Sequence, residues 1–171
     1  QEAVSRIRSL TIVHDLLSGH DLEGTSIEAL ARTVTTEVVH TLCGDEPRIQ
    51  WSVSGDEVVV SARQATILAL LLNEFVTNAI RHGFNEGEKG TVAVRCRREG
   101  NWAVLEVEDT GHGLPPSFDL RTSRGLGLQI ARTLTEVDLR GQLAIMSSDA
   151  GTTVRIRFIP DALVPAGEGA S

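Results

Sequence analysis

The chain has few aromatic residues and a deficit of positive charge, and both features exclude common functions. Four Phe, two Trp and no Tyr stand among 171 residues, so a stacking platform for single-stranded nucleic acid is not expected. The 23 Asp and Glu residues outnumber the 16 Lys and Arg residues, which leaves a formal charge of -7. A surface that neutralises phosphates needs a basic excess, so we expect no nucleic-acid partner.

Cysteines and long apolar runs are also scarce. Cys43 and Cys96 lie far apart without a CxxC spacing, which predicts two reduced, buried thiols and fits a reducing cytoplasm. No apolar run reaches the roughly 18–20 residues that a membrane span needs, and no signal peptide opens the chain. The histidines show no metal-ligand spacing, and no Gly-x-Ser-x-Gly elbow is present. We therefore expect a cytoplasmic chain without membrane contact.

The hydrophobic pattern predicts one compact domain with short tails. Apolar residues at helical spacing predict helices over residues 3–17, 27–42, 62–83 and 126–137. Alternating residues predict strands over residues 49–53, 58–60, 91–97, 102–108, 141–147 and 152–159. Hairpin turns join the last four strands in pairs, so the fold class is α+β. We expect a two-layer sandwich, with helices on one face of a mixed, mostly antiparallel sheet.

A polar stripe runs along the predicted helix 62–83. Glu74, Asn78 and His82 are four residues apart, so they share one face. A carboxylate and an amide suit a hydrated Mg²⁺, with Asn78 as direct ligand and Glu74 holding a water or acting as a base. Arg81 and His82 are placed to reach phosphate oxygens. A solvated helix face would show the same pattern, so the stripe alone leaves both interpretations open.

Asp109 ends a predicted strand and enters a glycine loop. An ionised carboxylate accepts a hydrogen bond from the exocyclic amine of adenine, whereas guanine carries a carbonyl at that position. Gly111 and Gly113 lack side chains where a base must approach the backbone. An ordinary turn after a strand is the alternative interpretation.

Two further glycines precede the predicted helix 126–137. Free N–H groups and the helix dipole favour an anion beside Gly125 and Gly127, although a simple helix entry has the same residues. Thr152 follows Gly151 on a predicted strand. Its hydroxyl is a candidate for the adenine-side hydrogen-bond network, with a surface strand residue as the alternative.

In this order, the segments resemble the ATP-binding domain of the histidine-kinase, gyrase, Hsp90 and MutL superfamily. Residues 74–82 resemble its N box, 109–113 and 125–128 its two glycine boxes, and 151–152 its closing Gly-Thr. The resemblance covers about residues 26–159. It implies a Bergerat-type fold with a left-handed βαβ arrangement, in which ATP lies between helices and sheet under a mobile lid.

The resemblance also implies the cofactors ATP and Mg²⁺ and a set of site residues. Glu74 is then catalytic and Asn78 binds the metal. The expected nucleotide-binding residues are Asn78, Arg81, His82, Asp109, Gly111, Gly113, Arg124, Gly125, Leu126, Gly127, Leu128 and Thr152.

Within the superfamily, residues 6–17 resemble the end of the dimerisation helices of bacterial sensor histidine kinases. A short lid and the sequence His82-Gly83-Phe84 match the short-lid subfamily. The implied organisation is a truncated dimerisation helix (1–20), an ATP-binding domain (21–160) and a disordered tail (161–171).

The chain begins without Met inside a helical pattern, which predicts a fragment. The resemblance implies that the γ-phosphoryl of ATP passes to a histidine outside this fragment, and then to a response-regulator receiver domain, in a homodimeric full-length protein. His14 is a weaker candidate acceptor. Two alternatives remain open: an anti-sigma-factor-type serine kinase, which normally lacks the preceding helix, and a non-catalytic ATP-gated interaction module.

Overall fold

The computed structural model describes residues 24–44, 48–118 and 125–161. Several predicted features lie outside the described residues: the helix 3–17, His14, residues 119–124 of the predicted lid (114–124), which include Arg124, and the tail from residue 162.

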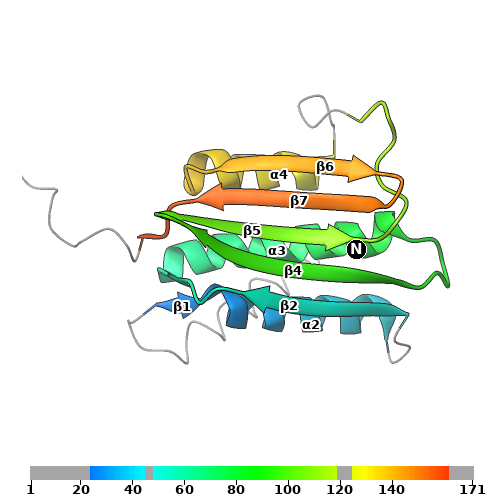
Figure 1. Ribbon diagram of the computed structural model, residues 1–171, viewed down its shortest axis with the longest axis horizontal. Helices are drawn as coiled ribbons and strands as arrows, with labels where there is room; N and C mark the ends of the chain where they lie inside the picture. The colour runs from blue at the N-terminus through cyan, green and yellow to red at the C-terminus, as the bar shows by residue number, and fades with distance from the viewer. Residues whose placement is uncertain (1–23, 45–47, 119–124, 162–171) are drawn as a thin grey trace, which may run out of the picture.

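A five-stranded mixed sheet forms one layer of the molecule (Figure 1). The strand order is β2-β4-β5-β7-β6, in which β2 and β4 are parallel and all other neighbours are antiparallel. The bounds are β2 Ile49–Gly55, β4 Gly90–Glu99, β5 Trp102–Asp109, β6 Gln142–Ser148 and β7 Gly151–Phe158.

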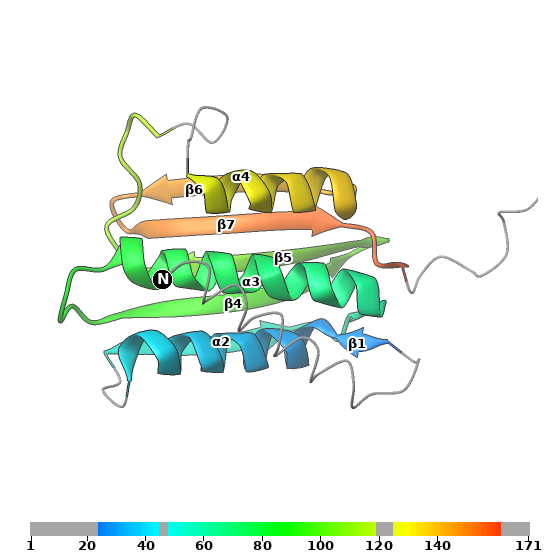
Figure 2. The same ribbon diagram turned by 180° about the vertical axis from the view of Figure 1, so that it is seen from behind.

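In the described part of the chain, helices α2, α3 and α4 form the second layer and cover the same face of the sheet (Figure 2). Helix α3 runs along the middle of this layer, between α2 and α4. The bounds are α2 Ile27–Cys43, α3 Ala62–Gly83 and α4 Leu126–Thr133. The α+β sandwich predicted from the sequence is therefore confirmed.

Helix α3 begins at a capping serine and buries one continuous apolar face. The Ser61 hydroxyl accepts a hydrogen bond from the Gln64 N–H at 3.2 Å, which satisfies one of the free donors at the helix start. Leu68, Leu72 and Val76, each four residues from the next, have no exposed surface. Because this face points into the core, the polar stripe of the same helix is left at the core's edge.

Two local features differ from the sequence-based expectation. The predicted helix 126–137 is α-helical only to Thr133 and continues as a π-helical turn, η1 (Leu134–Asp138). A second small sheet pairs β1 (Thr25–Ser26) with β3 (Val59–Val60), so β3 does not join the main sheet. Neither difference alters the layer arrangement. Among the described residues, no helix has the length and apolarity to span a membrane.

Candidate functional site

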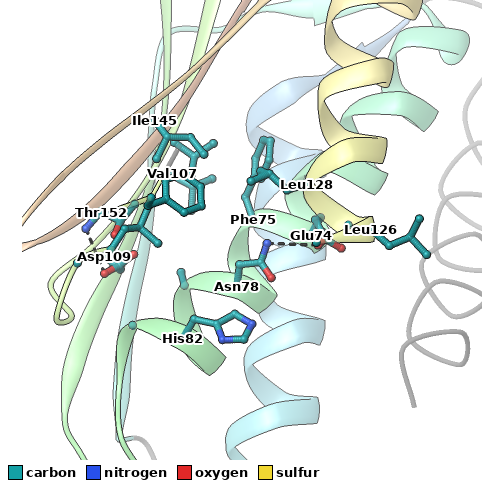
Figure 3. Close-up of a pocket in the computed structure, with 18 residues that line it drawn as sticks. Glu74, Phe75, Asn78, His82, Val107, Asp109, Leu126, Leu128, Ile145 and Thr152 are labelled. Carbon is teal, nitrogen blue, oxygen red and sulfur yellow. Dashed lines mark hydrogen bonds between the residues drawn. The ribbon is translucent and has the colours of Figure 1, made fainter. Parts of the chain in front are cut away.

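A cavity of about 330 Å³ opens between α3, α4 and strands β5, β6 and β7. Ten of the residues predicted from the sequence line it, and Figure 3 shows several of them pointing into one space. These ten are Glu74, Asn78, His82, Asp109, Gly113, Gly125, Leu126, Gly127, Leu128 and Thr152. Residues from four separated segments of the sequence therefore meet at one site.

Two predicted site residues, Arg81 and Gly111, do not line the cavity, and a third, Arg124, lies outside the described residues. Arg81 is exposed on α3. Gly111 is buried behind the wall, where a Cβ would come within 2.1 Å of the Gly83 carbonyl oxygen. Gly111 thus lacks a side chain because the loop packs on the end of α3. The approach of a base to Gly111 stays a prediction.

Asp109 lies at the end of β5 with a carboxylate that is held in one orientation. Its Oδ1 accepts hydrogen bonds from the Gly111 N–H at 2.9 Å and the Thr152 N–H at 3.3 Å. Its Oδ2 has no donor among the described residues and remains available to a ligand in the cavity. Burial raises the pKa of Asp109, although the two backbone N–H groups oppose this shift.

The Gly151-Thr152 pair positions this carboxylate. A Cβ on Gly151 would lie 1.9 Å from the Asp109 carbonyl oxygen, and the residue has a φ of +132° that side chains rarely adopt. The glycine lets β7 approach Asp109 closely enough for the next N–H to reach its side chain. Thr152 thus donates its backbone N–H to Asp109, and its hydroxyl lies 3.4 Å from the Ser147 hydroxyl.

Glu74 and Asn78 form the opposite end of the site. The Asn78 Nδ2 donates a hydrogen bond to Glu74 Oε1 at 3.2 Å, shown as a dashed line in Figure 3. A Cβ on Gly127 would lie only 1.7 Å from the same Oε1. The Glu74 carboxylate therefore lies against Gly127 in the first turn of α4, and a side chain there would require the carboxylate to move.

The donors at this end suit a hydrated magnesium ion. Asn78 Oδ1 has no donor among the described residues, and Glu74 keeps a second carboxylate oxygen. Among the described residues, no group of three His, Cys, Asp or Glu side chains could hold a metal ion. Mg²⁺ characteristically binds through one or two protein oxygens, phosphate oxygens and water.

The sequence reasoning did not identify the apolar wall of the cavity or the contact that supports its rim. The wall between the two polar ends consists of Phe75, Val107, Leu128, Ile145 and Val154. At the rim of the cavity, the Ser147 hydroxyl accepts a hydrogen bond from the Leu114 N–H at 2.7 Å. This hydrogen bond links the segment that follows the glycine loop to β6. The sequence pattern of β6 could have identified both features. Residues 143, 145 and 147 alternate along the strand, so their side chains lie on the face that the helices cover.

Comparison with known proteins points to one family. The family of histidine kinase-, DNA gyrase B- and HSP90-like ATPases matches residues 63–162. Sensor histidine kinase PdtaS of Mycobacterium tuberculosis is 35% identical over 158 residues, which cover 91% of this chain and 31% of that protein. A blue-light-activated histidine kinase of Brucella anthropi is 32% identical over 170 residues, covering 93% and 29%. The chain thus spans about a third of these relatives.

Solved structures show the same fold. The histidine kinase domain of the Erythrobacter litoralis blue-light-activated histidine kinase superposes with a TM-score of 0.80 and 25% identity. The match covers 94% of this chain and 75% of that one. The chain therefore belongs to the family of histidine kinase-, DNA gyrase B- and HSP90-like ATPases, and it is homologous to the ATP-binding catalytic domains of sensor histidine kinases.

Proposed function

We propose that this chain binds Mg·ATP and transfers the γ-phosphoryl group to a histidine that lies outside it, as part of a two-component sensor histidine kinase. One observation carries the proposal. A buried carboxylate with one free oxygen and a carboxylate–amide pair beside a glycine-rich helix start stand at opposite ends of one apolar cavity. This order of chemical groups suits a ligand with an adenine base at one end and phosphates at the other.

At the base end, Asp109 selects adenine. Its Oδ1 is held by two backbone N–H groups, so Oδ2 faces the ligand as an acceptor. An adenine amine donates to that oxygen, whereas a guanine carbonyl would meet it with like partial charge. The apolar wall covers the faces of the base.

At the phosphate end, α4 offers backbone N–H groups. Its cap residue, Gly125, provides no side-chain cap, so the first-turn donors remain available to an anion. Magnesium, when bound, neutralises charge on the phosphates, and Asn78 Oδ1 would hold it. In this proposal, Glu74 accepts the proton of the attacking histidine nitrogen or of a water. Arg81, His82 and Arg124 remain candidates for phosphate contacts. Catalysis in such a site rests on positioning and charge stabilisation.

The remaining partners follow from the sensor-kinase assignment. We place the acceptor histidine on a dimerisation domain that precedes this chain, with a receiver domain as the next acceptor and a homodimer as the full-length assembly. A cytoplasmic location agrees with two free thiols at Cys43 and Cys96. The serine-kinase and interaction-module alternatives are not favoured, because the relatives at 35% and 32% identity are named histidine kinases.

The chemical stability of the product tests this proposal. Full-length protein incubated with γ-labelled ATP and Mg²⁺ should acquire phosphate that is lost in acid and kept in alkali, as a phosphoramidate behaves. Asn78→Asp should abolish the label, and Glu37→Gln, an exposed change on α2, should leave it unchanged. Acid-stable label would identify a serine kinase instead. The absence of label from a folded full-length protein would contradict kinase activity.

A further inference from the structure

We propose that Ser147 of β6 is a positioning residue of the nucleotide site, because its hydroxyl joins the Thr152 side chain to the main chain at Leu114. The inference rests on the proposed function for its effect on nucleotide affinity. Leu114 and Thr152 both line the cavity, whereas Ser147 is not among the residues that line it. Ser147 therefore acts through these two neighbours and not by contact with the ligand.

The first argument is the place of Ser147 in the sheet. Ile145, two residues earlier on β6, lines the cavity (Figure 3), so strand alternation places Ser147 on the same face. Ser147 lies directly opposite Thr152 on β7, and their hydroxyl oxygens are 3.4 Å apart. Thr152 in turn donates its backbone N–H to the Asp109 carboxylate at 3.3 Å. Ser147 thus contacts a residue that holds the base-recognising carboxylate in its orientation.

The second argument is the packing of the glycine loop on β6. A Cβ on Gly113 would lie 2.1 Å from the Ser148 carbonyl oxygen and 2.8 Å from Ser147 Oγ, so the loop's main chain lies directly on this strand. The next N–H, that of Leu114, donates to Ser147 Oγ at 2.7 Å. Because Gly113 and Leu114 both line the cavity, this hydrogen bond fixes part of its rim.

A hydroxyl suits this position because it can accept and donate at the same time. The Ser147 oxygen accepts from the Leu114 N–H. Its single proton is available to the Gly151 carbonyl oxygen or to the Thr152 hydroxyl, each 3.4 Å away. Removing the hydroxyl therefore takes an acceptor from Leu114 and a partner from Thr152 in one step. Both consequences fall at the Asp109 end of the cavity, where the proposed function places adenine.

The experiment combines calorimetric titration of ADP, with Mg²⁺, and NMR measurement of amide exchange at Leu114 in the unliganded 171-residue chain. Ser147→Ala removes the hydroxyl, and Ser147→Cys nearly keeps the volume but forms weak hydrogen bonds. Thr152→Val and the double variant with Ser147→Ala complete a cycle. Ser148→Ala is the matched control, because that hydroxyl accepts from the Ala150 N–H within the hairpin turn. Thermal unfolding verifies that each variant is folded.

Both Ser147 variants should raise the dissociation constant of ADP about three- to tenfold, the factor expected for the loss of one or two neutral hydrogen bonds. The Leu114 amide should exchange at least about tenfold faster in both variants. Ser148→Ala should change neither quantity. The double variant should lose less affinity than the product of the two single losses, because each substitution removes the same contact between the hydroxyls.

Three results would overturn the inference: a folded Ser147→Ala with the ADP affinity of the wild type, an unchanged Leu114 exchange rate in that variant, or a double variant whose loss equals the product of the single losses. A wild type that binds no ADP with Mg²⁺ would instead contradict the proposed function. In that case the Leu114 exchange rates of the unliganded proteins would still test whether Ser147 anchors this segment.

Discussion

Replacing Asp109 with Asn tests how the base end of the cavity recognises its ligand, since the two side chains have nearly the same shape. Two backbone donors converge on Oδ1 at 2.9 and 3.3 Å, so the amide oxygen of the variant must take that position. The opposite orientation would bring an NH₂ group against two N–H groups. The NH₂ group therefore replaces Oδ2 and faces the adenine amine as a second donor.

The expected loss of affinity follows from this exchange. A hydrogen bond to a charged acceptor contributes about 1.5–3 kcal/mol, so the dissociation constant of ADP should rise about 10–100-fold. Folding should be little affected. The cost of burying the charge disappears and both backbone N–H groups keep an acceptor, so the free energy of unfolding should change by less than about 1 kcal/mol.

The assay is calorimetric titration of ADP and GDP with Mg²⁺ into wild type and Asp109→Asn, together with urea unfolding of both proteins. GDP should gain relative to ADP in the variant, because the guanine carbonyl accepts from the new NH₂ group. A folded variant whose ADP dissociation constant stays within about threefold of the wild type would refute the reasoning.

Three other properties can be tested on the same chain. Because burial raises the pKa of Asp109, ADP affinity should decline with acid at a higher pH than an ordinary aspartate would cause. The free energy of unfolding of the wild type, relative to that of Asp109→Asn, should rise as the pH falls through that raised pKa. Calorimetric titration of ADP and urea unfolding between pH 4 and 7 check the two predictions. An ADP affinity and a stability difference that stay constant over this range would contradict them. Burial raises the pKa of the Cys96 thiol to about 11, so iodoacetamide at pH 8 should modify this thiol only after the protein unfolds. Peptide mass spectrometry measures the modification. Rapid labelling of Cys96 in the native protein would contradict the prediction. Gly151→Ala should lower the free energy of unfolding by more than about 3 kcal/mol, because its Cβ would lie 1.9 Å from the Asp109 carbonyl oxygen. The control Gly100→Ala has open space around it and a φ of +62°, so it should cost about 1–2 kcal/mol. Equal urea midpoints of the two variants would argue against the close packing of β7 on Asp109.

Strong local patterns made most of the fold predictable. The predicted helix 62–83 has the same bounds as α3, because a capping serine and continuous 3.6-residue spacing coincide there. The hairpins followed from clean alternation. The pairing of β1 with β3 could not be predicted, because strands of two residues carry no periodicity.

The polar groups of the site were partly predictable for the same reason. Helical spacing alone placed Glu74 and Asn78 on one stripe, and the structure joins them by a hydrogen bond. The reasons for two glycines depend on contacts between distant segments. Gly111 packs against Gly83, and Gly127 lies beside the Glu74 carboxylate, so neither contact is visible in the local sequence.

The most direct measurement of the central claim is a calorimetric comparison of ADP and GDP binding to the wild-type chain, each with Mg²⁺ and with EDTA. The account predicts that ADP binds with Mg²⁺, that its affinity falls sharply in EDTA, and that GDP binds weakly in both conditions. Equal binding of the two nucleotides, or no binding of ADP to the folded chain in the presence of Mg²⁺, would contradict it.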